Sequence, residues 1–245
     1  MKILFSPSET KQTGGENPFD LSTLFLNQLY PYRNRLLYQY HDIIKSRSKT
    51  SLSKLFGIKK DKDINNYLLD IQHSVSLKAI KRYTGVAFNY LDYSTLSSSE
   101  QLYIDRNVII FSNLFGPILA SDLIPFYKLK QGMDINGYKP EKIYQEHSSL
   151  ILDSFLHTEE ILDLRAGFYD KFYKPSQKYT TLKFIKNGKV ISHWVKAYRG
   201  IILRKLAKEN IKSIQDLIKL PLQNLEIVEI QIKKNKTEII YKIFE

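Results

Sequence analysis

The chain has 245 residues, 43% of them hydrophobic, which is enough to bury a sizeable core in one large domain or two small ones. It contains no cysteine, and this excludes disulfides, zinc held by thiolates, iron–sulfur clusters and thiol-peroxidase chemistry. The formal net charge of +12 favours a polyanionic partner, for which nucleic acid is a commoner explanation than an anionic membrane surface.

The hydropathy pattern gives no sign of a membrane segment. No run of 18 apolar residues occurs, and the apolar stretch at the beginning is too short for a secretory signal. We therefore expect a cytoplasmic protein without membrane contact, and we favour a single domain over residues 1–245.

The first predicted strand, residues 2–5, runs into a polar turn that contains Ser6, Ser8 and Lys11. Strand ends that are followed by hydroxyls and a lysine are good places for a polar site, although an ordinary turn is the simpler alternative. The paired glycines in residues 12–18 predict a flexible loop that could act as a flap.

Helical spacing of apolar residues follows over 19–40, where Pro31 should divide the segment into two helices. Residues 50–74 read as helix, glycine turn and helix, with Gly57 in the turn and Lys59 just after it. This is the outline of a helix-hairpin-helix, in which turn amides hold a phosphate. A plain helical hairpin would look the same.

The middle of the chain alternates strand and helix patterns. The predicted elements are a helix start at 79–90, a helix capped within 94–100, a buried strand at 107–111, a loop-rich segment at 112–134, an amphipathic helix at 141–156 and a short strand at 161–164. Asp122, Tyr127 and Lys128 stand near glycines in the loop-rich segment, and Arg165 opens an aromatic-rich helix that ends at Tyr173.

A strand pattern, a turn and a basic helix follow within residues 180–210. Asn187-Gly188 predicts a tight β-hairpin turn, and the helical period begins near His193. At 100° per residue, one arc of roughly 140° contains four residues of interest, namely Lys196, Arg199, Gly200 and Arg204. Fixed cations beside a glycine could bind an anionic backbone, whereas the alternative is an ordinary solvated helix face. Residues 214–220 predict a helix, and 227–243 a terminal hairpin.

The five histidines do not form the Glu-x-x-His spacing of carboxylate-bridged iron sites. The nearest approach to a ligand cluster is His157 with Glu159 and Glu160, which also suits an exposed charge group at a helix end. We therefore expect no stable metal site and no cofactor.

Four motifs in the same order resemble the YaaA family of peroxide-stress proteins: ILFSPSETK, YTGVAFNYL with STLS after it, LFGPILASDLIPFYKLKQGM and SHWVKAYRGIILR. The resemblance covers essentially the whole chain. It implies a fold of α/β class (mixed α+β), a single compact domain with a mixed central sheet, surrounding helices, a helix-hairpin-helix-like element and a positively charged cleft. It also implies double-stranded DNA binding that limits damage by unincorporated iron during peroxide stress.

The residues that match family motif positions are Ser6, Lys11, Gly85, Asp122, Tyr127, Lys128, Lys196, Arg199, Gly200 and Arg204. One departure is Leu119-Ala120, where the family often has an arginine-proline pair. The turn around Gly57 diverges most from the family pattern.

Three functional hypotheses remain open. In the first, a non-catalytic protein binds DNA phosphates through Ser6, Lys11, Gly57, Lys59, Lys128, Lys196, Arg199, Gly200 and Arg204, with little sequence preference. In the second, an enzyme acts on a nucleotide, base or nucleoside in a pocket that adds Ser8, Asp122, Tyr127, Arg165 and His193. The third is a basic protein that binds nucleic acid by charge alone. A small closed pocket would favour the enzyme, and an open groove as wide as a duplex would favour DNA binding.

Overall fold

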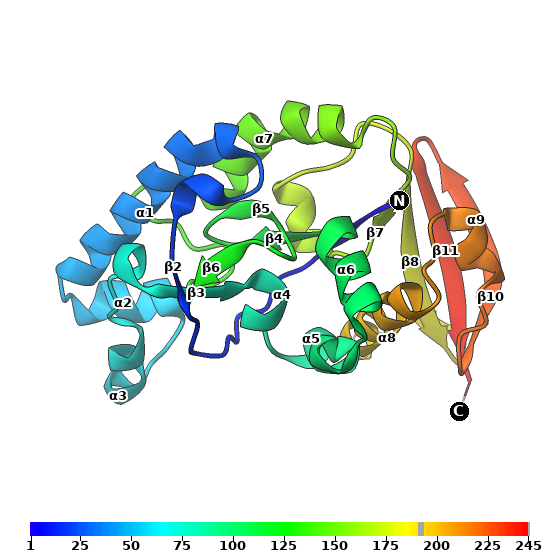
Figure 1. Cartoon of the computed structure of the whole chain (residues 1–245), viewed down its shortest axis with the longest axis horizontal. Coiled ribbons are helices and arrows are strands. Elements are labelled where there is room, and N and C mark those ends of the chain that lie inside the picture. Colours follow the sequence, from blue (N-terminus) through cyan, green and yellow to red (C-terminus); the bar gives the residue numbers. More distant parts are fainter. Residues whose placement is uncertain (191–193, 245) are drawn as a thin grey trace.

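A mixed sheet forms the centre of the computed structural model, which describes residues 1–190 and 194–244 (Figure 1). Its strands are β1 (Lys2–Phe5), β4 (Val108–Ser112), β5 (Gly116–Leu119), β7 (Ile161–Asp163), β8 (Tyr179–Lys186), β9 (Lys189–Val190), β10 (Leu225–Lys233) and β11 (Lys236–Ile243). They are arranged in the order β10-β11-β8-β7-β1-β4-β5, and β9 pairs with β8.

The inner strands of this sheet are parallel. β1 pairs in parallel with β4 and β7, β7 with β8, and β8 with β11. Ile3 and Leu4 in β1 are fully buried, as is every residue of β4. Continuous burial of this kind is typical of parallel strands with both faces covered, and it explains the unbroken apolar run at residues 108–111 within the strand predicted at 107–111. The antiparallel strands β5, β9 and β10 complete the sheet.

A second, antiparallel sheet consists of β2 (Asn17–Pro18), β3 (Val75–Lys78) and β6 (Leu123–Pro125). It anchors the glycine-containing loop before β2. The buried guanidinium of Arg82 donates hydrogen bonds to the carbonyl oxygens of Gln12 (2.7 Å) and Gly14 (2.9 Å). The loop is therefore tied to the core, and the expectation of a free flap was wrong.

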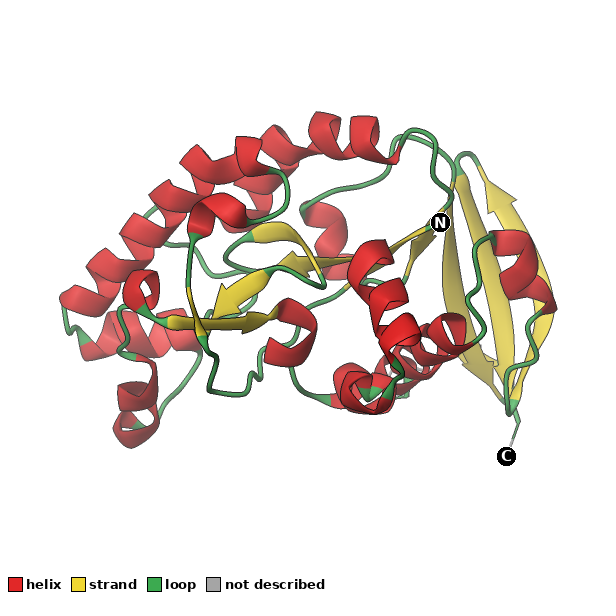
Figure 2. Ribbon diagram, in the orientation of Figure 1, coloured by secondary structure: helices red, strands yellow, loops and turns green. Residues whose placement is uncertain are grey.

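Helices lie on both sides of the main sheet, as Figures 1 and 2 show. The α-helices are α1 (Tyr30–Lys45), α2 (Lys49–Phe56), α3 (Asp61–Ile64), α4 (Ala79–Arg82), α5 (Val86–Leu91), α6 (Ser98–Asn107), α7 (Pro140–Leu156), α8 (Val195–Lys208) and α9 (Ile214–Lys219). The 3-10 turns are η1 (Leu21–Thr23), η2 (Asn27–Leu29), η3 (Asn65–Tyr67), η4 (Ile71–His73), η5 (Tyr93–Thr95) and η6 (Gly167–Lys171). In the view of Figure 1, α1 and α7 run along the upper side and α5 and α8 along the lower side.

These elements confirm the predicted mixed α/β fold with a mixed central sheet and surrounding helices. The hairpin turn is also as expected, since Asn187 and Gly188 both have positive φ (51° and 73°) between β8 and β9. Two helices were misjudged. Pro31 lies in the first turn of α1, where a missing N–H is harmless, and the segment before it forms only η1 and η2. The helix expected after Arg165 is only the short turn η6.

The predicted helix, turn and helix around Gly57 exists in outline. Gly57 has φ 67° and ends α2 as its left-handed C-cap, because its N–H bonds back to the carbonyl of Ser53. The second helix, α3, has four residues. The glycine is therefore explained by helix termination. In the part of the chain that the structure describes, no helix has the length and apolar character needed to cross a bilayer.

Candidate functional site

A cavity of about 440 Å³ lies beyond the carboxyl ends of β1 and β7, and we call it the main cavity. Its floor is formed by the turns after these strands, and its side by α5 and α8. Ligands in α/β folds commonly bind beyond the carboxyl ends of parallel strands, because the connecting loops diverge there. The residues that line it are Phe5, Ser6, Pro7, Ser8, Glu9, Thr10, Gly85, Val86, Ala87, Phe88, Gln131, Leu164, Ala166, Tyr169, Lys196 and Arg199.

The turn after β1 is held rigidly against the turn after β7. Ser6 Oγ accepts a hydrogen bond from the N–H of Ala166 (2.8 Å), which leaves its own hydroxyl hydrogen free to donate. The hydroxyls of Ser8 and Thr10 are used within the loop. Thr10 donates to the carbonyl of Thr84 (3.0 Å), so the 3.0 Å contact between the two hydroxyls takes the hydrogen of Ser8. Ser6 therefore offers the available hydroxyl donor of this turn.

Two cations of α8 reach the main cavity. Lys196 is exposed at the mouth, and Arg199 is half-buried deeper in. Burial lowers the pKa of Arg199, and the charge of Asp163 opposes this effect. Within residues 1–190 and 194–244, neither side chain forms a hydrogen bond or an ion pair. The predicted cation pair is thus brought together at one site with its donors free.

Gly200 has a different role from the one expected. It is buried where α8 crosses α5, and an added Cβ would collide with the backbone carbonyl of Ala87 and lie 3.0 Å from the N of Leu91. The glycine therefore lets the two helices approach closely and sets the position of Lys196 and Arg199. It does not open the helix to a phosphate, which corrects that interpretation.

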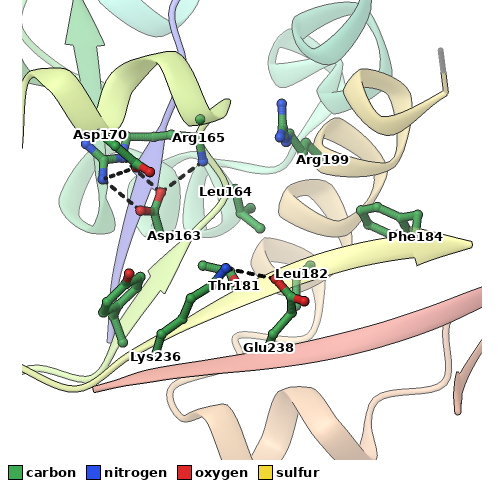
Figure 3. A pocket seen from close by; sticks show the side chains of 12 residues that line it. Asp163, Leu164, Arg165, Asp170, Thr181, Leu182, Phe184, Arg199, Lys236 and Glu238 are labelled. Carbon is green, nitrogen blue, oxygen red and sulfur yellow. Dashed lines mark hydrogen bonds and ion pairs between the residues drawn. The ribbon is translucent and has the colours of Figure 1, made fainter. Parts of the chain in front are cut away.

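A smaller cavity of about 160 Å³ lies on the other side of Arg199 and Leu164, the two residues that line both cavities (Figure 3). Its wall contains ion pairs. Arg165 is buried and grips Asp163 with its Nε (2.9 Å to Oδ1) and Nη2 (2.7 Å to Oδ2), and Lys236 lies 2.8 Å from Glu238. Arg165 is therefore a structural partner of Asp163 and not a free cation.

Two further groups give the smaller cavity its polar character. The Oγ1 of Thr181 is buried in its wall without a hydrogen-bond partner among the described residues. Burial raises the pKa of Asp170, whose carboxylate lies 3.8 Å from Arg165. A buried hydroxyl without a partner is uncommon in native proteins, so the space is suited to a polar occupant.

Lys11 points away from both cavities. Its Nζ lies 4.1 Å from the ring centre of Tyr127 and 5.1 Å from that of Tyr83, and it donates to the carbonyl of Ser8 (3.2 Å). Burial, with a smaller effect from the charge of Lys128, lowers its pKa to about 7. Lys128 itself is 13% exposed and lies 3.3 Å from a carboxylate oxygen of Glu9.

Asp122 and Tyr127 also lie outside the cavities, in the part of the protein that the structure describes. Asp122 Oδ2 accepts the N–H groups of Phe25 (2.9 Å) and Leu119 (3.0 Å), and burial raises the pKa of this carboxyl to about 6. The Tyr127 hydroxyl lies 2.8 Å from both Tyr83 and Ser112 in the core. Both side chains bond groups inside the protein. Of the residues expected to share one pocket, Ser6 lines the main cavity, whereas Lys11 and Asp122 do not.

The remaining predicted residues are scattered. Arg204 donates to the carbonyl oxygens of Leu91 and Asp92 (both 2.8 Å) and so caps α5. Gly57 and the exposed Lys59 lie near α2 and α3, which Figure 1 places well away from α8. His193 lies outside the described residues.

Sequence reasoning missed five residues around the cavities: Asp163, Tyr169, Thr181, Lys236 and Glu238. The one available signal was an acidic residue, Asp163, at the end of the short predicted strand 161–164. Among residues 1–190 and 194–244, no three His, Asp or Glu side chains are placed to hold a metal ion.

The fold and the site define a mixed α/β protein with a cation-lined cavity at the carboxyl edge of its parallel strands. The family model described as "Peroxide stress protein YaaA" matches residues 1–231. The chain belongs to this family of peroxide stress proteins, as the four motifs predicted.

Relatives from several bacteria match the chain over most of its length. An uncharacterised protein of Campylobacter jejuni is 48% identical over 246 residues, which cover 100% of both chains. A UPF0246 protein of Fusobacterium nucleatum is 30% identical over 239 residues, 93% of each chain. A UPF0246 protein of Corynebacterium efficiens is 29% identical and covers 84% of this chain and 85% of its own.

Proposed function

We propose that this peroxide stress protein binds double-stranded DNA through the cations at the mouth of the main cavity, and that binding limits iron-mediated oxidative damage to the DNA. The observation that carries the proposal is the pair Lys196 and Arg199. They lie one turn apart on α8, and their charges are not neutralised by any carboxylate within the described chain. The net charge of +12 supports a polyanionic partner.

Phosphate contacts give a physical route to protection. Each phosphate that a lysine or arginine neutralises releases condensed cations, and the logarithm of affinity falls with the logarithm of salt concentration by about 0.9 per phosphate. Ferrous ions that sit on phosphates would be displaced by the same contacts, so hydroxyl radicals would form farther from the DNA. Backbone contacts carry no sequence information, and we expect little sequence preference.

The test is a DNA titration at several salt concentrations with Lys196→Glu. Lys196 is exposed and has no ion-pair partner in the described part of the chain, so the change should leave the fold intact. We expect weaker binding to all duplex sequences and a salt slope that is smaller by about 1. Lys208→Glu is the matched control, because it makes the same charge change at the exposed end of the same helix. If Lys196→Glu and Lys208→Glu bound DNA with equal affinity, the proposal that DNA binds at the mouth of the main cavity would be wrong.

Protection needs its own measurement. Supercoiled plasmid is treated with ferrous iron and peroxide, and strand breaks are counted with wild-type or Lys196→Glu protein. We expect the wild type to reduce breakage and the variant to protect less, in proportion to its loss of binding. If both proteins protected the plasmid equally, protection would not depend on DNA binding by Lys196, and this part of the proposal would be wrong.

The exposed Lys59, between α2 and α3, is a second proposed phosphate contact, because its ammonium group can reach an anionic backbone. It lies apart from α8 in Figure 1, so a duplex must be long to reach both. Lys59→Glu should weaken binding to long duplexes and leave short ones unaffected. Equal effects on both lengths would argue against a separate contact.

An enzyme that acts on a nucleotide is the second candidate, and the cavity volume of about 440 Å³ favours it, because this volume suits a small molecule and a rigid duplex cannot enter it. The nearest nucleophile is Ser6, whose Oγ is bonded to the Ala166 amide and not to a base. Incubation with nucleotides and nucleosides, followed by chromatography, tests this candidate. Release of a free base or phosphate would support it.

A further inference from the structure

We propose that the main cavity binds one nucleotide, with its phosphate on Arg199 and its base against the apolar wall of the cavity. This goes beyond duplex binding at the cavity mouth, because backbone contacts to Lys196 do not require the interior to be filled.

Arg199 is a half-buried cation that has no counter-ion within residues 1–190 and 194–244. Its nearest acidic influence is Asp163, but both oxygens of Asp163 are held by Arg165 at 2.7 and 2.9 Å. A charge removed from water is costly unless it is paired and hydrogen-bonded. An anion in the main cavity would supply that partner. Figure 3 shows the guanidinium projecting from α8 into the space above Leu164.

The groups beside Arg199 suit a phosphate in particular. The guanidinium offers parallel N–H donors that match two phosphate oxygens. Ser6, across the cavity, has a free hydroxyl hydrogen and is oriented by the Ala166 amide. Lys196 adds a second positive charge at the mouth. The one carboxylate that lines this cavity, Glu9, lies 3.3 Å from Lys128 and is partly neutralised there.

The rest of the main cavity is too large and too apolar for a phosphate alone. Its volume of about 440 Å³ lies within the range of small-molecule sites, about 300–1,000 Å³. Phe88 and Tyr169 contribute aromatic side chains to its wall, and Val86 and Leu164 contribute aliphatic ones. A flat, largely apolar group that carries a phosphate fits this combination, and a nucleobase has the required π-face.

The smaller cavity behind Arg199 offers hydrogen-bonding groups that suit hydroxyls. Its wall presents the hydroxyl of Thr181, which has no partner among the described residues, and two carboxylates that are already paired with cations, Asp170 with Arg165 (3.8 Å) and Glu238 with Lys236 (2.8 Å). Carboxylate oxygens in such pairs can still accept hydrogen bonds from hydroxyls. The chemistry of both cavities together describes a nucleoside monophosphate, either free or as a single nucleotide turned out of a strand.

The experiment is calorimetric titration of the full chain with nucleoside monophosphates, the corresponding nucleosides and inorganic phosphate. We expect saturable binding of at least one monophosphate, and weaker binding of its nucleoside and of phosphate. Arg199→Gln should weaken monophosphate binding by about tenfold or more, the loss expected for a charge-assisted bidentate contact. Lys208→Gln is the matched control on the same helix and should bind as the wild type does. Thermal melting of each variant checks that it is folded.

A second variant separates the interior from the mouth. Val86 is 47% exposed and lines the main cavity, so Val86→Trp should fill the space without changing any charge. We expect it to abolish monophosphate binding while duplex binding is retained. Lys196→Glu should do the reverse and weaken duplex binding more than monophosphate binding. The failure of one proposal is therefore distinguishable from the failure of the other.

Oligonucleotides identify the source of the nucleotide. If the ligand comes from a strand, Val86→Trp should also weaken binding to single-stranded or mismatched DNA, but not to a perfect duplex. If the ligand is free, the variant should affect the monophosphate alone, and either result supports the site. The proposal is overturned if no monophosphate binds at millimolar concentration, or if Arg199→Gln and Val86→Trp, both folded, bind it as the wild type does.

Discussion

Arg165 holds both carboxylate oxygens of Asp163, and within the described residues Arg199 has no acidic partner of its own. Asp163 ends β7, Arg165 lies in the turn after this strand, and α8 supplies Arg199. The charge of Asp163 acts on the pKa of Arg199, but its two oxygens are already bonded to Arg165, so the charge of Arg199 remains available to a ligand. Both proposals depend on this cation.

The pair can be tested by its removal. Asp163→Asn removes the close counter-charge of the buried Arg165 guanidinium and leaves it the longer 3.8 Å contact to the exposed Asp170, and we expect the free energy of unfolding to fall by about 3–5 kcal/mol. Urea denaturation at neutral pH measures the change. Glu238→Gln breaks the more exposed pair with Lys236 and should cost less than about 1 kcal/mol. Similar losses in the two variants would contradict a buried structural role for Asp163.

The crossing of α5 and α8 sets the position of the site and depends on Gly200. In Gly200→Ala the added methyl group would lie 2.9 Å from the carbonyl carbon of Ala87, so the helices must move apart. We expect a loss of about 1–3 kcal/mol in stability, together with weaker DNA and nucleotide binding. Gly167→Ala is the control, since nothing lies near its Cβ position, and its stability should stay within about 0.5 kcal/mol of wild type. An unchanged Gly200→Ala protein would show that the helices are not in close contact.

Local signals in the sequence predicted the local structure well. Asn187-Gly188 forms the hairpin turn because both residues tolerate positive φ, and the apolar run at 108–111 forms most of the buried strand β4. Lys196 and Arg199 lie on one face of α8 and line the same cavity, as the predicted arc of cations indicated. Arg204 belongs to the same arc, but it donates to the carbonyl oxygens at the end of α5. Its role depends on how α5 packs against α8, which the sequence of α8 alone does not show.

The composition of the smaller cavity could not be read from local patterns. Glu238 is opposite Thr181 only because β11 pairs in parallel with β8, two strands separated by more than 50 residues of chain. Lys11 was placed in the site because it follows the hydroxyls at a strand end, and Asp122 because it stands near glycines in a loop-rich segment. Their side chains turned inward to bond backbone groups, a choice that depends on the tertiary positions of Phe25 and Ser8.

Asp122 should affect stability without affecting binding. Burial raises its pKa to about 6, above the value near 3.8 in the unfolded chain, so the folded state binds the proton more tightly. Stability should therefore decrease as pH rises from about 4 to 6. Asp122→Asn keeps an oxygen acceptor for Phe25 and Leu119 and removes this dependence. Urea denaturation across this pH range measures the effect. If Asp122→Asn also weakened DNA or nucleotide binding, Asp122 would have a role in the binding site and the purely structural role would be wrong.

Lys11 should have a pH dependence in a different window. Burial lowers its pKa to about 7 in the folded protein, against 10.5 in the unfolded chain, so between these values the unfolded state binds more protons. The contribution of this lysine to stability therefore rises with pH between about 7 and 10, by at most about 1.4 kcal/mol per pH unit. Below pH 7 the lysine is charged in both states, and its full desolvation cost opposes folding.

Lys11→Met tests this by keeping the alkyl chain over the rings of Tyr83 and Tyr127 and removing the ammonium group. We expect the variant to be more stable than the wild type at pH 6 and the difference to shrink steadily towards pH 9, because the wild-type lysine becomes neutral in the folded state. Urea denaturation at each pH gives the free energies, and Lys130→Met at an exposed position controls for the general loss of a positive charge. Parallel stability profiles for Lys11→Met and wild type would mean that the buried lysine keeps its ordinary pKa, and that the aromatic rings and the Ser8 carbonyl fully offset its desolvation.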